Sequence, residues 1–154
     1  MDCSTNNPDI IISGNLDFTG TGAGTEFISM GSGDWTVSGN VNLTNGTITP
    51  EASNFILNSS NNQTLNPGSS SFYDLTVSNT STNGVRLSTN TLTVTNALAI
   101  DSDATLDLNG ISLIMTGATF SNEGTLKLQG GEILTDFEND TEEGTIEYYG
   151  DDTY

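Results

Sequence analysis

Histidine, cysteine and basic residues are scarce in this chain, and each shortage excludes a class of function. The sequence has no histidine, so Ser-His-Asp triads and histidine-ligated zinc sites cannot form. Cys3 is the single cysteine and cannot form an internal disulfide. Arg86 and Lys127 are the only basic side chains, and two cations cannot neutralise a phosphate backbone. We therefore predict no nucleic acid partner.

Long apolar runs are absent as well. No stretch approaches the ~20 apolar residues that a membrane-spanning helix needs, so we predict no membrane insertion. Only 33% of the residues are hydrophobic and the formal net charge is −18, a combination that is typical of disordered chains. Whether the chain folds therefore depends on how its apolar residues are arranged.

Short segments of the chain alternate apolar and polar residues. Asn40–Thr44, Leu75–Ser78 and Leu92–Thr95 show this alternation, which predicts strands with one buried face. The Gly and Asn residues between such segments suit turns, and no stretch has the spacing of an amphipathic helix. The same pattern predicts further strands at Leu16 and Phe18, 27–30, Trp35 and Val37, 55–57, Leu106 and Leu108, Leu126 and Leu128, and Ile146 and Tyr148.

A repeat with a period of 20 residues indicates the architecture. Similar segments of seven residues begin at Ala104, Gly124 and Gly144. This period, with short strands in each repeat, predicts an all-β fold, a parallel β-solenoid with coils of about 20 residues. Leu106, Leu126 and Ile146 should then stack in one inward column. An antiparallel β-sandwich is the alternative, but it gives no reason for the repeat.

The repeat also suggests how the rest of the chain is organised. Trp35-Thr36-Val37-Ser38 matches Leu92-Thr93-Val94-Thr95 at an offset of 57 residues, close to three periods, which places Trp35 and Leu92 at equivalent positions. We divide the chain into an amino-terminal extension or cap (1–13), the solenoid coils (14–131) and an acidic terminal coil or cap (132–154).

One stretch resembles a known group of proteins. Asp103-Ala104-Thr105-Leu106-Asp107-Leu108-Asn109-Gly110 and Ser121-Asn122-Glu123-Gly124-Thr125-Leu126-Lys127-Leu128 lie within 75–131. This stretch resembles the repeats of large secreted bacterial β-helical surface proteins, namely adhesins of the filamentous-haemagglutinin and autotransporter-passenger type. The resemblance implies a segment of a surface protein that continues into further repeats of a longer chain.

Two acidic segments are candidates for calcium binding. Asp101, Asp103, Asp107 and Asn109 place oxygen ligands near one another in sequence, but the glycine and the closing Glu of an EF-hand loop are missing. The second segment, 132–154, holds nine of the 20 acidic residues. We expect solvated carboxylates at the first segment and a cap that prevents end-to-end stacking at the second, with no metal or cofactor.

Aromatic residues suggest a different kind of site. Most of them, including Phe27, fall at alternating positions that predict core packing. Tyr73, Tyr149 and Tyr154 are out of phase and are candidates for stacking on sugar rings. Six Asn-x-Ser/Thr triplets also occur, as the composition leads one to expect, at Asn42, Asn45, Asn58, Asn62, Asn79 and Asn139.

The sequence therefore predicts a non-enzymatic, extracellular structural or adhesion module, a β-solenoid stalk segment of a cell-surface protein. Its expected partners are glycans or proteins of a host or neighbouring cell surface. One alternative is a carbohydrate-binding module. Another is a polysaccharide-active β-helix enzyme, which would need two carboxyl groups facing each other in a cleft; we expect no catalytic residues.

Overall fold

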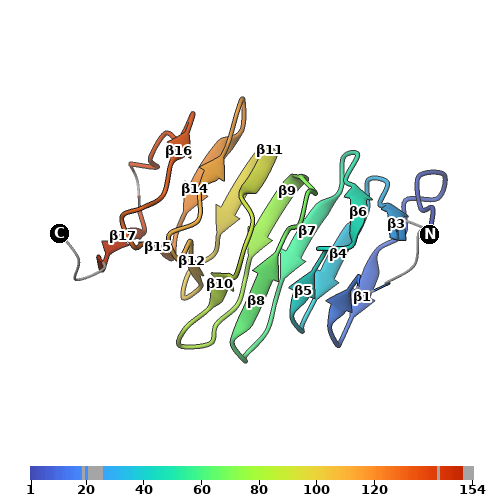
Figure 1. The fold of residues 1–154 in the computed structure, drawn as a ribbon, viewed down its shortest axis with the longest axis horizontal. Helices are drawn as coiled ribbons and strands as arrows, with labels where there is room; N and C mark the ends of the chain where they lie inside the picture. Colours follow the sequence, from blue (N-terminus) through green and yellow to red (C-terminus); the bar gives the residue numbers. More distant parts are fainter. Residues whose placement is uncertain (19, 21–25, 142, 151–154) are drawn as a thin grey trace.

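The chain is a parallel β-solenoid of about six coils with about 21 residues in each coil. The computed structural model describes residues 1–18, 20, 26–141 and 143–150. These residues form 17 strands and no helix, so none of them belongs to a helix that could span a membrane. The first strand, β1 (Ile10–Ile12), and the last, β17 (Thr145–Tyr148), lie at opposite ends of the stack (Figure 1). The predicted solenoid is confirmed, and the antiparallel sandwich is wrong.

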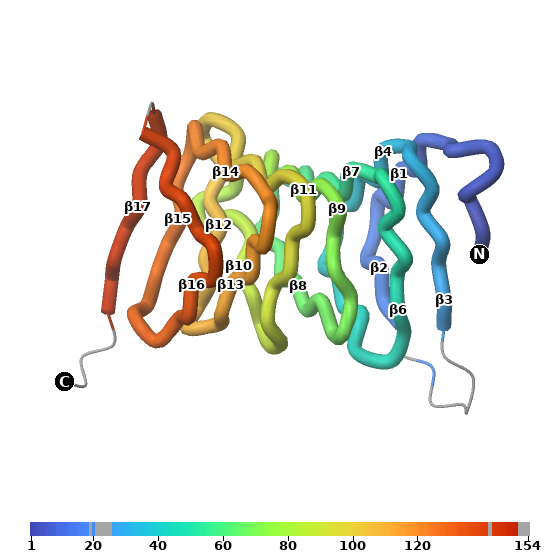
Figure 2. Tube along the Cα trace, turned by 90° about the horizontal axis from the view of Figure 1, so that it is seen from above, coloured from blue at the N-terminus to red at the C-terminus, as the bar shows by residue number. Residues whose placement is uncertain are grey.

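Each coil runs along successive sides of the solenoid, and Figure 2 shows the coils following one another along its axis. The first sheet contains β1, β4 (Asp34–Val37), β7 (Asn54–Leu57), β9 (Phe72–Val77), β11 (Leu92–Ile100), β13 (Leu113–Ile114), β14 (Thr119–Asn122) and β16 (Leu134–Thr135). The second sheet contains β2 (Leu16–Asp17), β5 (Val41–Asn42), β8 (Gln63–Asn66), β10 (Val85–Leu87), β12 (Thr105–Asp107), β15 (Thr125–Leu128) and β17. A short third sheet pairs β3 (Glu26–Ser29) with β6 (Gly46–Thr49).

Apolar side chains form continuous columns inside the solenoid. In the first sheet, Trp35 pairs with Phe55, Phe55 with Leu75, and Leu75 with Leu98, and all four are almost fully buried. Because a parallel strand pair keeps equivalent residues on one face, each inward residue packs on its counterpart in the next coil. Burying one such side chain contributes about 2–3 kcal/mol of transfer free energy. A few inward residues per coil thus suffice for a core.

The predicted column on the second sheet is confirmed. Leu106 pairs with Leu126, and Leu126 pairs with Ile146. Leu106 and Leu126 are fully buried, whereas Ile146 is 37% exposed. Ile146 lies in β17, the end strand of this sheet, which has a paired strand on one side only. The column therefore loses its cover at the carboxyl-terminal end of the described chain.

The predicted equivalence of Trp35 and Leu92 is wrong. The ladder carries Trp35 through Phe55 and Leu75 to Leu98, steps of 20, 20 and 23 residues. The longer step includes a register shift between Val94 and Ala97 in β11. Coil length therefore varies, because a bulge or a longer corner can absorb extra residues without disturbing the ladder on the flat sides.

Strand pairing continues into both terminal segments, 1–13 and 132–154. Ile10–Ile12 pairs in register with β4, β16 pairs with β13, and β17 pairs with β15.

The expectation that Phe27 belongs to the core is wrong. Phe27 is 48% exposed, and its neighbour Ile28 takes the buried position instead. Alternation alone does not tell which of two adjacent apolar residues points inward.

Adjacent residues of β7 provide a matched test of the inward and outward faces. Leu57 is fully buried, and Ile56 points outward and is half-buried. Leu57→Ala should lower the free energy of unfolding by about 2–5 kcal/mol, because it opens a cavity in a packed column. Ile56→Ala should lower it by less than about 1 kcal/mol. Urea denaturation measures both changes, and equal losses would show that the two faces are assigned incorrectly.

Candidate functional site

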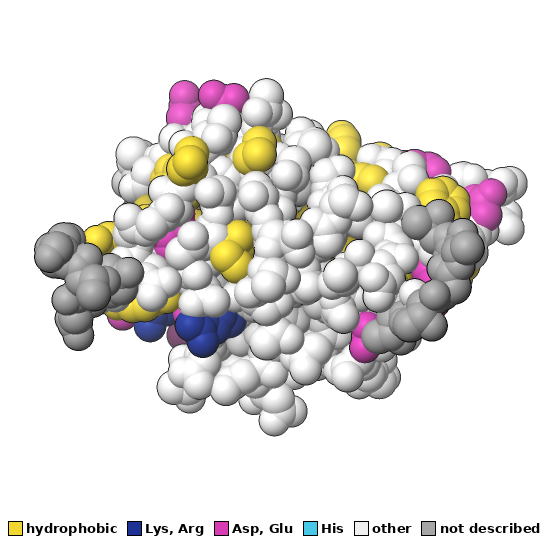
Figure 3. Space-filling model, in the orientation of Figure 1, with side chains coloured by type: hydrophobic (Ala, Val, Ile, Leu, Met, Phe, Trp, Pro, Cys, Tyr) yellow, Lys and Arg dark blue, Asp and Glu magenta, His cyan; other side chains and the backbone are white. Residues whose placement is uncertain are grey.

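The two basic side chains of the protein lie in one column on the outer face of the second sheet. Arg86 of β10 pairs with Asp107 of β12, Asp107 with Lys127 of β15, and Lys127 with Glu147 of β17. Positive and negative side chains therefore alternate at the coil spacing of about 4.8 Å. We call these four residues the charge column. Figure 3 shows Lys and Arg gathered in one patch on this face of the molecule.

Each basic side chain of the charge column is paired with an acidic one. Arg86 Nε lies 3.4 Å from Asp107 Oδ2, and Lys127 Nζ lies 3.2 Å from Glu147 Oε1. Arg86 and Glu147 are about half exposed, so each pair contributes at most about 1 kcal/mol to stability. The main effect of the alternation is electrostatic: the column is locally neutral on a protein of net charge −18.

Asp107 is the best-connected member of the charge column. Its Oδ1 accepts hydrogen bonds from Tyr149 Oη at 3.1 Å and from the backbone N–H of Asn109 at 2.8 Å. Burial and the hydrogen bond to Asp107 raise the pKa of Tyr149 above its ordinary value of 10.0, so its hydroxyl remains a donor in alkaline solution as well as at neutral pH. The ring centroid of Tyr149 is 5.6 Å from Lys127 Nζ, within the range of a cation–π contact. Tyr149 thus joins two coils of the column.

A groove of about 390 Å³ lies beside the charge column on the second sheet. This volume is within the range of ~300–1,000 Å³ that is usual for small-ligand sites. We call it the second-sheet groove; its lining residues are Asn62, Gln63, Thr64, Asn83, Gly84, Arg86, Asp107 and Lys127. Gly84 has a φ of +61°, and a Cβ atom there would overlap the carbonyl oxygen of Thr105. Only glycine fits at this position without displacing the neighbouring coil.

A buried amide pair fixes one wall of the groove. Gln63 is 2% exposed, and its Nε2 donates to the carbonyl oxygens of Val37 at 3.0 Å and Gly39 at 2.7 Å. Its Oε1 accepts a hydrogen bond of 2.7 Å from Nδ2 of Asn79, which is fully buried. Because the amide groups of Gln63 and Asn79 both have hydrogen-bond partners inside the solenoid, they hold the backbone around Gln63 in one arrangement. Burial of Asn79 also makes its Asn-x-Ser triplet inaccessible in the folded protein.

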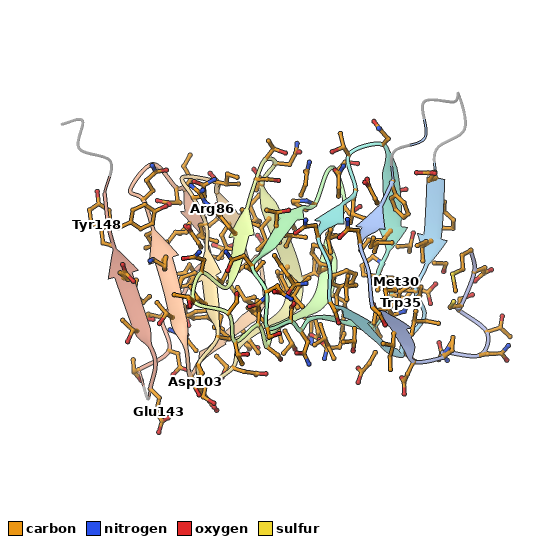
Figure 4. All side chains as sticks on the ribbon, turned by 90° about the horizontal axis from the view of Figure 1, so that it is seen from below. Met30, Trp35, Arg86, Asp103, Glu143 and Tyr148 are labelled. Carbon is orange, nitrogen blue, oxygen red and sulfur yellow. The ribbon has the colours of Figure 1, made fainter. Side chains whose placement is uncertain are left out.

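The four candidate calcium ligands do not form a cluster. The carboxylate of Asp101 accepts a hydrogen bond from Ser78 Oγ, and Asp107 belongs to the charge column. Asn109 accepts a hydrogen bond from Arg86 and donates one to the carbonyl oxygen of Leu87. Figure 4 places Asp103 and Arg86, the partner of Asp107, at opposite edges of the solenoid. In the described part of the chain, no three Asp, Glu, Cys or His side chains are arranged to hold a metal ion.

Part of the acidic terminal segment is bound to the solenoid. The carboxylate of Glu132 accepts hydrogen bonds from the backbone N–H groups of Gly110 at 2.9 Å and of Gln129 and Gly130 at 2.6 Å each. Burial alone would raise the pKa of Glu132, but these backbone hydrogen bonds outweigh it and lower the pKa. Glu132 therefore joins two successive coils. The acidic residues Glu142, Asp151 and Asp152 lie outside the described residues.

The candidate tyrosines lie in different parts of the fold. Tyr73 is half-buried in β9 of the first sheet. Tyr149 follows β17 on the second sheet and contacts Asp107 and Lys127, which line the groove. Tyr154 lies outside the described residues. The structure thus brings Tyr149, but not Tyr73, close to the groove.

Sequence reasoning missed the groove, although two signals for it were present. When the three repeat segments are aligned, their fourth residues are Asp107, Lys127 and Glu147, which already alternate in sign. Gln63 pairs with Val85 in a column of otherwise apolar residues, and this pairing marks a buried polar group. This pairing cannot be found from the sequence alone, because the coils differ in length and the register between them must be known first.

Comparison of the chain with protein-family models, with curated proteins and with solved structures found no match. The fold, a parallel β-solenoid, is thus known from the structure, and no relative identifies the family of the chain.

The lowered pKa of Glu132 predicts a pH-dependent contribution to stability. Its carboxylate stabilises the fold fully above its ordinary pKa of 4.5, and this contribution is lost as the pH falls through the lower pKa of the folded state. Glu132→Gln should therefore reduce the free energy of unfolding by about 1 kcal/mol at pH 7. In urea denaturation, the difference between the two proteins should shrink as the pH is lowered below 4.5. A difference that does not depend on pH would contradict this role.

The dispersed candidate ligands predict no calcium-specific stabilisation. Salt should raise the melting temperature by screening the repulsion within a chain of net charge −18. Calcium chloride should raise it no more than magnesium chloride at equal ionic strength, as measured by differential scanning calorimetry. A larger rise with calcium that is abolished by Asp101→Asn together with Asp103→Asn would establish a calcium site.

Proposed function

We propose that this chain is a non-enzymatic structural module of an extracellular cell-surface protein, a β-solenoid segment that holds a binding face at a fixed position. The observation that carries the proposal is the unbroken series of in-register strand pairs from β2 to β17 along the second sheet. Such a series makes one stiff unit with a length set by the number of coils, about 30 Å for six.

The surface composition supports an exposed location. Acidic side chains greatly outnumber basic ones, which keeps neighbouring molecules apart, and the outward strand positions carry mainly Thr, Ser, Asn and Asp. The resemblance of 75–131 to the repeats of filamentous-haemagglutinin and autotransporter-passenger adhesins agrees with this location. Glycans or proteins of an opposing cell surface are the proposed partners.

The chemistry of the second-sheet groove does not suit glycoside hydrolysis. Hydrolysis of a glycosidic bond requires two carboxyl groups on opposite sides of the bond. Asp107 is the one carboxylate among the described residues that line the second-sheet groove, and it is bound to Arg86, Tyr149 and Asn109. This arrangement leaves no second carboxyl group in the groove to serve as acid or nucleophile.

Surface display tests the proposed role. The chain is placed between a cell-surface anchor and an epitope tag, and loss of the tag is followed during digestion with proteinase K. We expect the tag to remain far longer than on a glycine-serine linker of equal length, because stacked coils expose little extended backbone. We also expect no increase in reducing ends when the purified chain is incubated with polysaccharides. Equal rates of tag loss on the two linkers, or an increase in reducing ends, would contradict the proposal.

A further inference from the structure

We propose that the second-sheet groove binds a neutral saccharide, a short stretch of uncharged hexopyranose units. A spacer function requires a regular rod, but it does not require a groove whose backbone is fixed by internal hydrogen bonds. The inference rests on the proposed function, because it specifies the chemistry of the glycan partners, but it can fail while the structural role of the solenoid stands.

The charges around the groove favour a neutral ligand. Arg86 and Lys127 line it, but the carboxylates of Asp107 and Glu147 already neutralise them. The protein as a whole carries a net charge of −18, so an anionic glycan is repelled at long range and meets no unpaired cation at the groove. A cationic ligand would compete with Arg86 and Lys127 for the same two carboxylates. An uncharged ligand avoids both costs.

The hydrogen-bonding groups of the groove suit sugar hydroxyls. In the described part of the chain, the side chains of Asn62, Thr64 and Asn83 make no hydrogen bond within the protein, and all three are exposed at the groove. An amide side chain offers both donors and acceptors. Each sugar hydroxyl also donates and accepts, so neighbouring hydroxyls can bridge these amides to the Arg86 and Asp107 pair.

The groove is also positioned to hold a ligand without reorganising. The backbone around Gln63 is fixed because the side-chain amide of Gln63 is hydrogen-bonded to Val37, Gly39 and Asn79 inside the solenoid. The backbone around Gly84 is fixed by the Gly84 N–H, which donates to the carbonyl oxygen of Ser81 at 3.0 Å. Because the backbone at both places is fixed before binding, the conformational entropy lost when a ligand enters comes mainly from the exposed side chains of Asn62, Thr64 and Asn83.

Tyr149 provides the aromatic surface that sugar recognition commonly uses. It is 39% exposed, and its hydroxyl is held by Asp107, which lines the groove. The apolar C–H face of a pyranose ring packs well on an aromatic ring. In Figure 4, Arg86 and Tyr148, which precedes Tyr149, lie along the same edge of the solenoid. Amides at one end and an aromatic ring at the other define a site for a chain of sugars.

NMR titration tests the proposal. The ¹⁵N-labelled protein is produced in a host that lacks N-glycosylation, because Asn62 begins an Asn-x-Thr triplet. The probes are tetrasaccharides of glucose (α-1,4 and β-1,4), mannose and galactose, with tetragalacturonate as the charged comparison. We expect at least one neutral probe to shift the side-chain amides of Asn62 and Asn83 in a saturable way, with a Kd on the order of 1 mM.

Matched variants locate the binding. Asn62→Ala combined with Asn83→Ala should weaken binding at least about tenfold, which is the loss of about 1.4 kcal/mol of binding free energy. Asn58→Ala removes an exposed amide outside the groove and should leave the Kd unchanged. An unchanged melting temperature shows that each variant is folded.

Three results would overturn the proposal. The first is no saturable shift with any neutral probe up to about 20 mM. The second is binding of tetragalacturonate alone, which would assign the groove to anionic sugars. The third is equal binding by the natural chain and the Asn62/Asn83 double variant, which would place the sugar elsewhere on the protein.

Discussion

The in-register stacking of one coil on the next is the constraint on which the rest of this structure depends. A parallel ladder satisfies the backbone of each strand and, at the same time, places equivalent residues above one another. Inward residues such as Leu57 therefore form apolar columns, and outward residues such as Arg86 form polar ones. A slip of one residue would exchange the two faces, since side chains alternate along a strand. The hydrophobic columns thus hold the outer columns in register as well.

Stacking also explains how a chain with few apolar residues and a large negative charge folds. Each coil needs only a few inward side chains, and the column continues through the whole stack. Some of the charge is compensated locally. The two cations alternate with Asp107 and Glu147, and the carboxylate of Glu132 accepts hydrogen bonds from backbone N–H groups of two coils. Polar residues inside the solenoid are tolerated where they form a satisfied pair, as Gln63 and Asn79 do. That pair also shapes the groove.

The sequence predicted those parts of the structure in which coils have equal length. The segments at Ala104, Gly124 and Gly144 are 20 residues apart, so the column through Leu126 could be found by alignment. Earlier coils differ in length, and the position of Trp35 could be assigned only with the ladder known. The groove escaped prediction for the same reason, because its lining residues come from coils joined by steps of 22, 21 and 20 residues. Closeness in sequence was misleading for the candidate calcium ligands, since a strand carries Asp107 away from Asp103.

Hydrogen exchange of individual backbone amides, measured by NMR in the native state, tests the stacking most directly. If the coils form one cooperative ladder, amides that donate between coils should exchange slowest in the central strands β7 to β12 and progressively faster toward β1 and β17, where a strand has a neighbour on one side only. Outward side chains should not affect this order. Protection that is uniform along the chain, or highest in the end strands, would contradict a solenoid held together by its coil-to-coil pairing.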